Sequence, residues 1–253
     1  PVVDGSTLPE GSNPHDFRDP KIWREEDGSY AFVVGSRHAD GSGQLLVYRS
    51  PDAMSWKLDT VLDRCHNAYG TMWECPDTFR LDGKDVILTS PMEMDAEGLE
   101  FHNGHGTLCI IGHYHPETKR MEREFVQAVE YGLDFYAMQT MQAPDGRRIM
   151  IAWLQNWGTN TQPPASQRWQ GQMTLPRELS IRNGKLIQVP VRELEALRRD
   201  RVTQQRVISG ETALPGVQGR VIDLMVQVRP VQEGSYQRFF MKVCKDERHY
   251  TEI

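Results

Sequence analysis

The stretch WECPDTF, residues 73–79, decides how this chain is organised, because it opens the second of three similar blocks. FRDPKIW at residues 17–23 opens the first block, and LDFYAMQ at residues 133–139 opens the third. Short apolar runs follow each opening stretch and are separated by Gly, Asp, Asn and Pro, the residues that punctuate turns. The pattern predicts short strands joined by tight connections.

The spacing of acidic residues in these stretches indicates a repeat. Asp19 and Glu74 are 55 residues apart, and Asp77 and Asp134 are 57 apart. Four strands every fifty-odd residues, with no helices between them, predict the blades of a β-propeller. A plain β-sandwich would also contain many short strands, but not blocks that each open on an acidic residue at a strand start. We therefore expect an all-β propeller.

The repeat predicts that acidic side chains meet at the centre of the fold. If the first strand of each block is the innermost, Asp19, Glu74 and Asp134 converge on one axial pocket. Glycoside hydrolysis needs such an arrangement, with one carboxylic acid for the leaving oxygen and one carboxylate for the anomeric centre. Another interpretation stays open, in which Asp19 and Asp77 are turn or strand-edge acids that satisfy backbone amides.

Length and charge exclude several classes of protein. The 253 residues are enough for one large domain or two small ones. They include 29 Lys and Arg against 35 Asp and Glu, a formal net charge of −6. This balance argues against a nucleic acid or an anionic membrane as partner. We see neither an apolar run of the ~20 residues that cross a bilayer nor a signal peptide, and we expect a cytoplasmic protein.

The cysteines and histidines do not form a recognisable metal site. No C-x-x-C pair occurs among Cys65, Cys75, Cys109 and Cys244, so buried or free thiols are expected. The four histidines at positions 102, 105, 113 and 115 are clustered, but the remaining ligands of a metal site are missing from any familiar order. We expect no metal and no cofactor.

Five segments of the chain form one ordered set: HDFRDPK (15–21), MWECPD (72–77), LDFYAMQT (133–140), WLQNW (153–157) and TLPREL (174–179). They resemble the R-D-P and E-C-P motifs, the D-F-Y-A-x-Q-T stretch, the fourth-blade tryptophan segment and the P-R-E-L strand of one enzyme family, glycoside hydrolase family 32. That family comprises β-fructofuranosidases such as invertases, sucrose-6-phosphate hydrolases, inulinases and levanases. The resemblance covers about residues 14 to 198, in the order and spacing of the family.

The resemblance implies a five-bladed propeller followed by a β-sandwich. On this basis residues 1–190 hold blades 2 to 5 of the catalytic propeller, the last of them in part. Residues 191–202 form a linker helix, for which 190–198 is the helical stretch, and residues 203–253 begin the sandwich. Strand-like runs at 207–209, 221–228 and 239–243 support the last assignment.

The resemblance also implies roles for residues around the first two motifs. Asp19 would stabilise the oxocarbenium-like transition state, with Arg18 beside it binding fructose hydroxyls. Glu74 would be the general acid and then the general base, and Cys75 would help to set its environment.

Three further positions carry over from the third motif and the tryptophan segment. Tyr136 and Trp157 would line the sugar pocket, and Asp134 would support them by hydrogen bonding. Trp157 also fits a simpler interpretation as an aromatic residue that packs a blade.

One motif of the family has no counterpart here. Its nucleophile is an Asp in a W-M-N-D-P-N-G motif upstream of R-D-P, and the sequence contains no such segment. Asp4 precedes Gly5 but lacks the flanking Trp, Asn and Pro. Retaining hydrolysis has no first step without its nucleophile. We therefore expect the first blade to be absent from this chain, a longer enzyme to supply it, and the chain alone to be inactive.

Other functions remain open at this point. A non-catalytic carbohydrate-binding propeller would also lack catalytic residues, and a related inverting five-bladed furanosidase would hold its carboxylates farther apart. Transfer of fructose to an acceptor sugar differs from hydrolysis only in the acceptor pocket. The expected partner in each case is a small sugar, and the choice among sucrose, sucrose 6-phosphate and fructans is undecided.

Overall fold

The structure is a computed structural model that describes residues 2–155, 157–158 and 165–253. The chain divides into two compact units, Pro1–Arg192 and Glu193–Ile253. Each is described by itself below.

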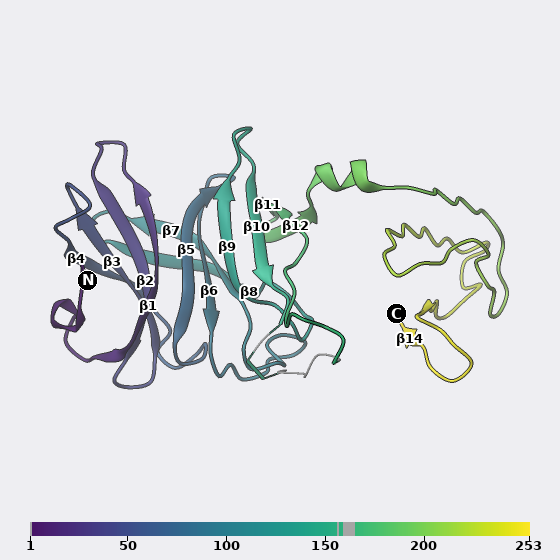
Figure 1. The fold of residues 1–253 in the computed structure, drawn as a ribbon, viewed down its shortest axis with the longest axis horizontal. Helices are drawn as coiled ribbons and strands as arrows, with labels where there is room; N and C mark the ends of the chain where they lie inside the picture. The colour runs from purple at the N-terminus through teal and green to yellow at the C-terminus, as the bar shows by residue number, and fades with distance from the viewer. Residues whose placement is uncertain (1, 156, 159–164) are drawn as a thin grey trace. The chain divides into compact units, whose positions relative to one another are not determined.

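The described residues of the first unit form three four-stranded antiparallel sheets (Figure 1). In each sheet the strands follow one another in chain order, so strands consecutive in the chain are hydrogen bonded to each other. A short 3-10 helix, η1 (Gly5–Thr7), precedes them. The first sheet is β1 (Ser12–Arg24), β2 (Tyr30–His38), β3 (Gly43–Ser50) and β4 (Lys57–Arg64). The second is β5 (Trp73–Leu81), β6 (Lys84–Pro91), β7 (Leu108–His115) and β8 (Arg120–Ala128). The third is β9 (Tyr136–Gln142), β10 (Arg148–Trp153), β11 (Arg177–Arg182) and β12 (Lys185–Pro190).

The middle strands of the second sheet carry apolar side chains on both faces. On β6, Ile87 packs toward the first sheet, in a core with Val33, Leu45 and Trp73. Its neighbours Val86 and Leu88 pack toward the third sheet, in a second core with Met150 and Leu179. Successive side chains of a strand point to opposite faces, so a strand buried on both sides reads as a continuous apolar run. The sheets therefore stack face to face.

The first strands of neighbouring sheets lie side by side, β1 against β5 and β5 against β9. This is the arrangement of the innermost strands of propeller blades. It confirms the all-β, propeller-like fold expected from the repeat. Residues 177–190 complete the third sheet. The assignment of residues 1–190 to blades 2 to 5, the last in part, stays a prediction.

Each of these three first strands carries a β-bulge at the same place. The backbone adopts the left-handed conformation at Asp19 (φ 66°), Cys75 (φ 48°) and Ala137 (φ 51°). The pairing register shifts at the same points, between Arg18 and Lys21 in β1 for example. An extra residue is left unpaired there, and the strand bends.

The bulges correct the alignment of the three blocks. They make Arg18, Glu74 and Tyr136 the equivalent residues, each directly before a left-handed position. The alignment on Asp19, Glu74 and Asp134 was wrong in this respect, and Asp134 lies before β9 begins. An acidic residue near a strand start is a weaker marker than the backbone geometry, which cannot be read from the letters.

The second unit differs from its predicted strands and helix. The helix at its start is η2, a 3-10 helix at Arg192–Leu197. Of the strand-like runs, only Lys242–Val243 (β13) is a strand, paired with Thr251–Glu252 (β14), while residues 207–209 and 221–228 form none. Their apolar side chains, such as Val207 and Val221, are exposed. A strand needs a partner edge and an apolar face to cover, and this unit provides neither to them. The beginning of a β-sandwich in residues 203–253 stays a prediction.

No helix in the described ranges 2–155, 157–158 and 165–253 combines the length and the apolar character needed to cross a membrane.

The approach of the second sheet to the first depends on one glycine. Gly35 of β2 pairs with Arg18 of β1, and a Cβ atom placed on Gly35 would lie 1.9 Å from the backbone carbonyl oxygen of Trp73. Any side chain at position 35 would therefore push β5 away from β1.

We expect Gly35→Ala to lower the free energy of unfolding by about 2 kcal/mol, because overpacking against a backbone atom cannot be relieved by a rotamer change. Denaturant unfolding of the variant measures this. Gly132→Ala is the matched control, since its Cβ would meet only the flexible Glu130 side chain at 3.9 Å. Equal unfolding midpoints for the two variants would contradict the prediction.

Candidate functional site

The Glu74 carboxyl group lies at the centre of the three inner strands and is hydrogen bonded from both sides. Its Oε1 accepts from Nε of Arg18 on β1 at 2.7 Å, and its Oε2 accepts from the Tyr136 hydroxyl on β9 at 2.5 Å. Glu74 itself is on β5 and is only 9% exposed. A buried carboxyl group is stable only when such partners replace its water. The equivalent residues of three sheets thus converge on one another.

Arg18 is held in place by a second carboxylate. Its Nη1 donates to Asp16 Oδ1 at 3.0 Å, and Asp16 Oδ2 lies 2.5 Å from Nη2 of Arg37. Burial alone would lower the pKa of Arg18, but the hydrogen bonds to Glu74 and Asp16 outweigh burial and raise it. The guanidinium therefore stays charged beside Glu74. The Arg18 side chain is about one third exposed, so it also reaches the solvent side of the site.

Asp19 contacts the second bulge. Its Oδ2 accepts from the Cys75 backbone N–H at 3.1 Å and lies 3.5 Å from the Cys75 thiol. Burial, together with the nearby Asp19 carboxylate, raises the pKa of Cys75 from 9.0 to about 12. The thiol is therefore protonated at neutral pH and acts as a weak donor to Asp19. This excludes a nucleophilic thiolate at Cys75.

Tyr136 is fully buried and forms the other wall of the site. Its hydroxyl oxygen is 3.0 Å from the Ser90 carbonyl oxygen as well as 2.5 Å from Glu74. Burial and the hydrogen bond to Glu74 raise the pKa of Tyr136 far above its usual value, so the hydroxyl stays a donor. The Tyr136 ring makes edge contacts with His105 and Trp157, at centroid distances of 6.4 and 6.5 Å.

Trp157 is beside the site but exposed. Its side chain is 59% accessible and also packs against Trp153, at a centroid distance of 5.4 Å. Trp157 therefore presents an aromatic ring to solvent next to Tyr136. An exposed ring of this kind can form the wall of a pocket. Asn156, which precedes it in the tryptophan segment, lies outside the described residues.

Two of the predicted acids take other positions. Asp134 is half-buried in the segment before β9, two residues from Tyr136, and its support of Tyr136 and Trp157 stays a prediction. Asp77 is buried and accepts from the backbone N–H and the hydroxyl of Thr140 on β9, at 3.0 and 2.7 Å. Asp77 therefore joins β5 to β9, in agreement with its interpretation as an acid that satisfies a backbone amide.

Three contributors were missed by the sequence analysis: Asp16, Ser90 and Met92, whose Sδ lies 3.8 Å from Nη2 of Arg18. Asp16 had a detectable signal, because residues i and i+2 of a strand share a face and Asp16 precedes Arg18 by two. Ser90 and Met92 had no signal in the sequence, since they contact residues of other sheets that are far from them along the chain.

Within the described residues no three His, Cys, Asp or Glu side chains form a group that could hold a metal ion. His113 and His115 instead contact the carboxylates of Glu124 and Glu122 on β8, at 2.9 and 2.5 Å.

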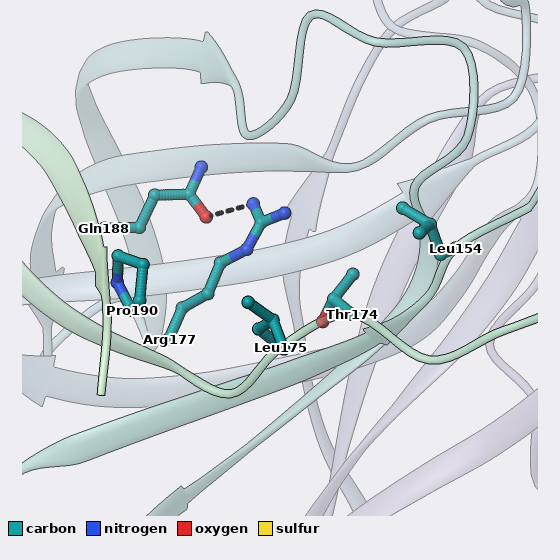
Figure 2. A pocket seen from close by; sticks show the side chains of 6 residues that line it. All are labelled: Leu154, Thr174, Leu175, Arg177, Gln188 and Pro190. Atoms are coloured by element: carbon teal, nitrogen blue, oxygen red, sulfur yellow. Dashed lines mark hydrogen bonds between the residues drawn. The ribbon is translucent and has the colours of Figure 1, made fainter. Parts of the chain in front are cut away.

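A separate cavity of about 380 Å³ lies over the third sheet (Figure 2). Its lining is Leu154, Thr174, Leu175, Arg177, Gln188 and Pro190. The charge of Arg177 is already satisfied, because its Nη1 is 2.8 Å from Gln188 Oε1 and 2.9 Å from Glu130 Oε2. The lining contains none of the residues around Glu74. We therefore take the cluster around Glu74, and not this cavity, as the candidate site.

The cluster can move a proton. A buried carboxyl group hydrogen bonded to one partly exposed cation and one hydroxyl can act as an acid or a base toward a ligand within hydrogen-bond distance. The Asp19 carboxylate on the neighbouring strand supplies a second negative charge. Two such groups can stabilise positive charge that develops on a sugar ring.

The chain is similar to sugar-cleaving enzymes in sequence. The family model described as glycosyl hydrolases family 32, N-terminal domain, matches residues 1–190. A raffinose invertase of Escherichia coli is 43% identical over 185 residues, which are 72% of this chain and 38% of the relative. A sucrose-6-phosphate hydrolase of the same organism is 40% identical over 199 residues, which are 78% of this chain and 41% of the relative.

Solved structures agree with this similarity. A family 32 β-fructofuranosidase of Bombyx mori, also solved as a D63A mutant with sucrose, superposes with a TM-score of 0.71 at 36% identity. The match covers 80% of this chain and 42% of that one. A sucrose-6-phosphate hydrolase from Lactobacillus gasseri superposes with a TM-score of 0.66 at 25% identity over 76% of this chain. The chain spans about two fifths of the length of these relatives.

The raised pKa of Cys75 has a direct chemical consequence. Because the thiolate forms only as the pH approaches about 12, its population at neutral pH is about a thousandfold below that of an ordinary thiol. We expect iodoacetamide to label the exposed Cys244 and to leave Cys75 almost unmodified between pH 7 and pH 9. Mass spectrometry of tryptic peptides from the native protein measures both rates. Equal labelling of Cys75 and Cys244 in the folded chain would contradict this picture, and urea-unfolded protein serves as the control in which both react.

Proposed function

The chain belongs to glycosyl hydrolase family 32, and from this premise we propose that it carries most of the sugar site of a retaining β-fructofuranosidase. The observation that supports the proposal is the convergence of Arg18, Glu74 and Tyr136, from three inner strands, on one buried carboxyl group.

Glu74 is the general acid and base in this proposal. It protonates the glycosidic oxygen as the bond to the fructose anomeric carbon breaks, and it later takes a proton from the attacking water. Tyr136 and Arg18 orient the carboxyl group, and Asp19 stabilises the positive charge on the fructose ring. Cys75 sets the surroundings of Asp19 through its N–H and its protonated thiol.

The nucleophile comes from outside these 253 residues. In the proposed two-step reaction an Asp carboxylate attacks the anomeric carbon to form a glycosyl-enzyme, which water then hydrolyses. We propose that a longer protein, with a five-bladed propeller, supplies this Asp on a first blade. The isolated chain would then bind sugar without cleaving it.

Substrate and location extend the same proposal. Sucrose, sucrose 6-phosphate and fructans share the β-fructofuranosidic bond, and the relatives are named for raffinose, sucrose and sucrose 6-phosphate. Tyr136 and Trp157 would line the sugar pocket, and Asp134 would support them by hydrogen bonding. An imported disaccharide would be hydrolysed in the cytoplasm.

The role of Glu74 predicts a large loss of turnover in one variant. In the complete gene product we expect Glu74→Gln to lower kcat for sucrose by roughly 10²- to 10⁴-fold with little change in sugar binding, because an amide cannot donate the proton. Glucose and fructose release measures kcat, and calorimetry measures binding. Glu122→Gln is the control, since Glu122 lies on the outer strand β8 and its side chain is exposed and contacts His115.

Two outcomes would overturn the assignment. Sugar binding without hydrolysis in the complete wild-type protein would support a non-catalytic binding propeller. Inversion at the anomeric carbon of the first-formed fructose, followed by NMR, would support the inverting furanosidase mechanism.

The external nucleophile predicts different behaviour for the 253-residue chain alone. We expect no sucrose turnover above the uncatalysed rate, while the complete gene product turns sucrose over. Sucrose turnover by the purified chain at rates typical of enzymes would show that the nucleophile is within it and would contradict this part of the proposal.

A further inference from the structure

Ser90 lies at the junction of the second and third sheets and is completely buried. It is next to last in β6 and pairs directly with Glu74 across the β5–β6 ladder. Nothing in the motifs singled out this residue. Its hydrogen bonds nevertheless lead directly to the candidate general acid.

Ser90 holds Tyr136 at two points. The Ser90 Oγ accepts a hydrogen bond from the backbone N–H of Ala137 at 3.0 Å, and it also lies 3.3 Å from the Thr107 hydroxyl. The Ser90 carbonyl oxygen lies 3.0 Å from the Tyr136 hydroxyl. One buried residue therefore contacts both the main chain at the start of β9 and the far end of the Tyr136 side chain.

The contact to Ala137 supplies a hydrogen-bond acceptor that the bulge would otherwise lack. Ala137 is in the left-handed conformation and is skipped by the β9–β10 pairing, so its N–H needs an acceptor outside that ladder. The equivalent N–H in β5, that of Cys75, finds the Asp19 carboxylate of the preceding sheet. Ser90 thus accepts the N–H of the left-handed residue in the third sheet, as Asp19 accepts the corresponding N–H in the second sheet.

We infer that Ser90 is a positioning residue for the general acid: it fixes the β9 bulge, and with it Tyr136, so that the Tyr136 hydroxyl faces Glu74 Oε2. This inference rests on the function proposed above for Glu74. Loss of the Ser90 hydroxyl leaves the part-buried N–H of Ala137 without its acceptor, and an unsatisfied donor away from bulk water drives local rearrangement. The rearrangement moves Tyr136, whose hydroxyl then leaves Glu74.

The test is a double-mutant cycle in the complete gene product. We expect Ser90→Ala to lower kcat for sucrose by roughly tenfold or more with KM changed less than twofold, since small displacements of catalytic groups cost this much. Tyr136→Phe gives the loss that follows from removing the hydroxyl alone. Because Ser90 acts through Tyr136, the double variant should be no slower than Tyr136→Phe. Losses that multiply would show that Ser90 acts independently, and would overturn the inference.

A second buried serine provides the control. Ser36 of β2 is also completely buried and accepts from Gln44 Nε2 at 3.3 Å, but it lies in the first sheet, with no described contact to β9. Ser36→Ala should leave kcat within twofold of wild type. An equal loss in Ser36→Ala and Ser90→Ala would mean that any buried cavity slows the enzyme, which again overturns the inference.

Amide hydrogen exchange separates this inference from the proposed function. Ser90→Ala should accelerate exchange at the Ala137 amide by at least tenfold and leave the Cys75 amide, which is held by Asp19, unchanged. Unchanged exchange at Ala137 would refute the positioning role. An inactive complete wild-type protein would refute the proposed function instead, and exchange at Ala137 would still decide whether Ser90 holds the bulge.

Discussion

The site depends on one constraint: position 35 must carry no side chain, because β5 occupies the space beside it. The Trp73 carbonyl oxygen lies where a Cβ atom would be, so β5 approaches β1 and β2 closely enough for Arg18 to reach Glu74 at 2.7 Å. Trp73 in turn fills the core between the first two sheets, and its indole N–H donates to the Tyr69 carbonyl at 2.8 Å. The tight packing between the sheets and the polar site therefore depend on each other, because the peptide unit that joins Trp73 to Glu74 takes part in both.

The three bulges direct one side chain of each inner strand toward the same point, the Glu74 carboxyl group. A regular strand would point alternate side chains away from the centre along its whole length. A left-handed residue at Asp19, Cys75 and Ala137 bends each inner strand at one level. Such residues cost about 1–2 kcal/mol each. Two of them are held here by acceptors from the neighbouring sheet, Asp19 for the Cys75 N–H and Ser90 for the Ala137 N–H. Asp19 follows Arg18 in the chain and Ser90 contacts Tyr136, so the groups that hold the bulges adjoin the two donors to the Glu74 carboxyl group.

The sequence predicted most residues of this site. It aligned the residues of the three strand blocks incorrectly with one another. The motifs pointed to Arg18, Asp19, Glu74, Cys75 and Tyr136, all of which the structure brings together around β5. Asp134 was aligned with Glu74 because both are acids near a strand start, yet the bulge geometry pairs Glu74 with Tyr136 and Arg18. Ser90 escaped notice because its partners on β5 and β9 are far from it along the chain. In the second unit, apolar alternation predicted strands that form no pairs, since alternation describes a face but not what covers it.

The sequence by itself determined the strand blocks of the first unit, because turn residues and side-chain alternation act over a few neighbouring residues. It also determined the family, since motifs such as RDPK and ECPD keep their order along the chain. Only the tertiary structure decided which side chains meet. Contact between Arg18, Glu74 and Tyr136 depends on the distance between sheets and on three backbone dihedral angles. Both are products of packing between segments more than fifty residues apart, which no local pattern encodes.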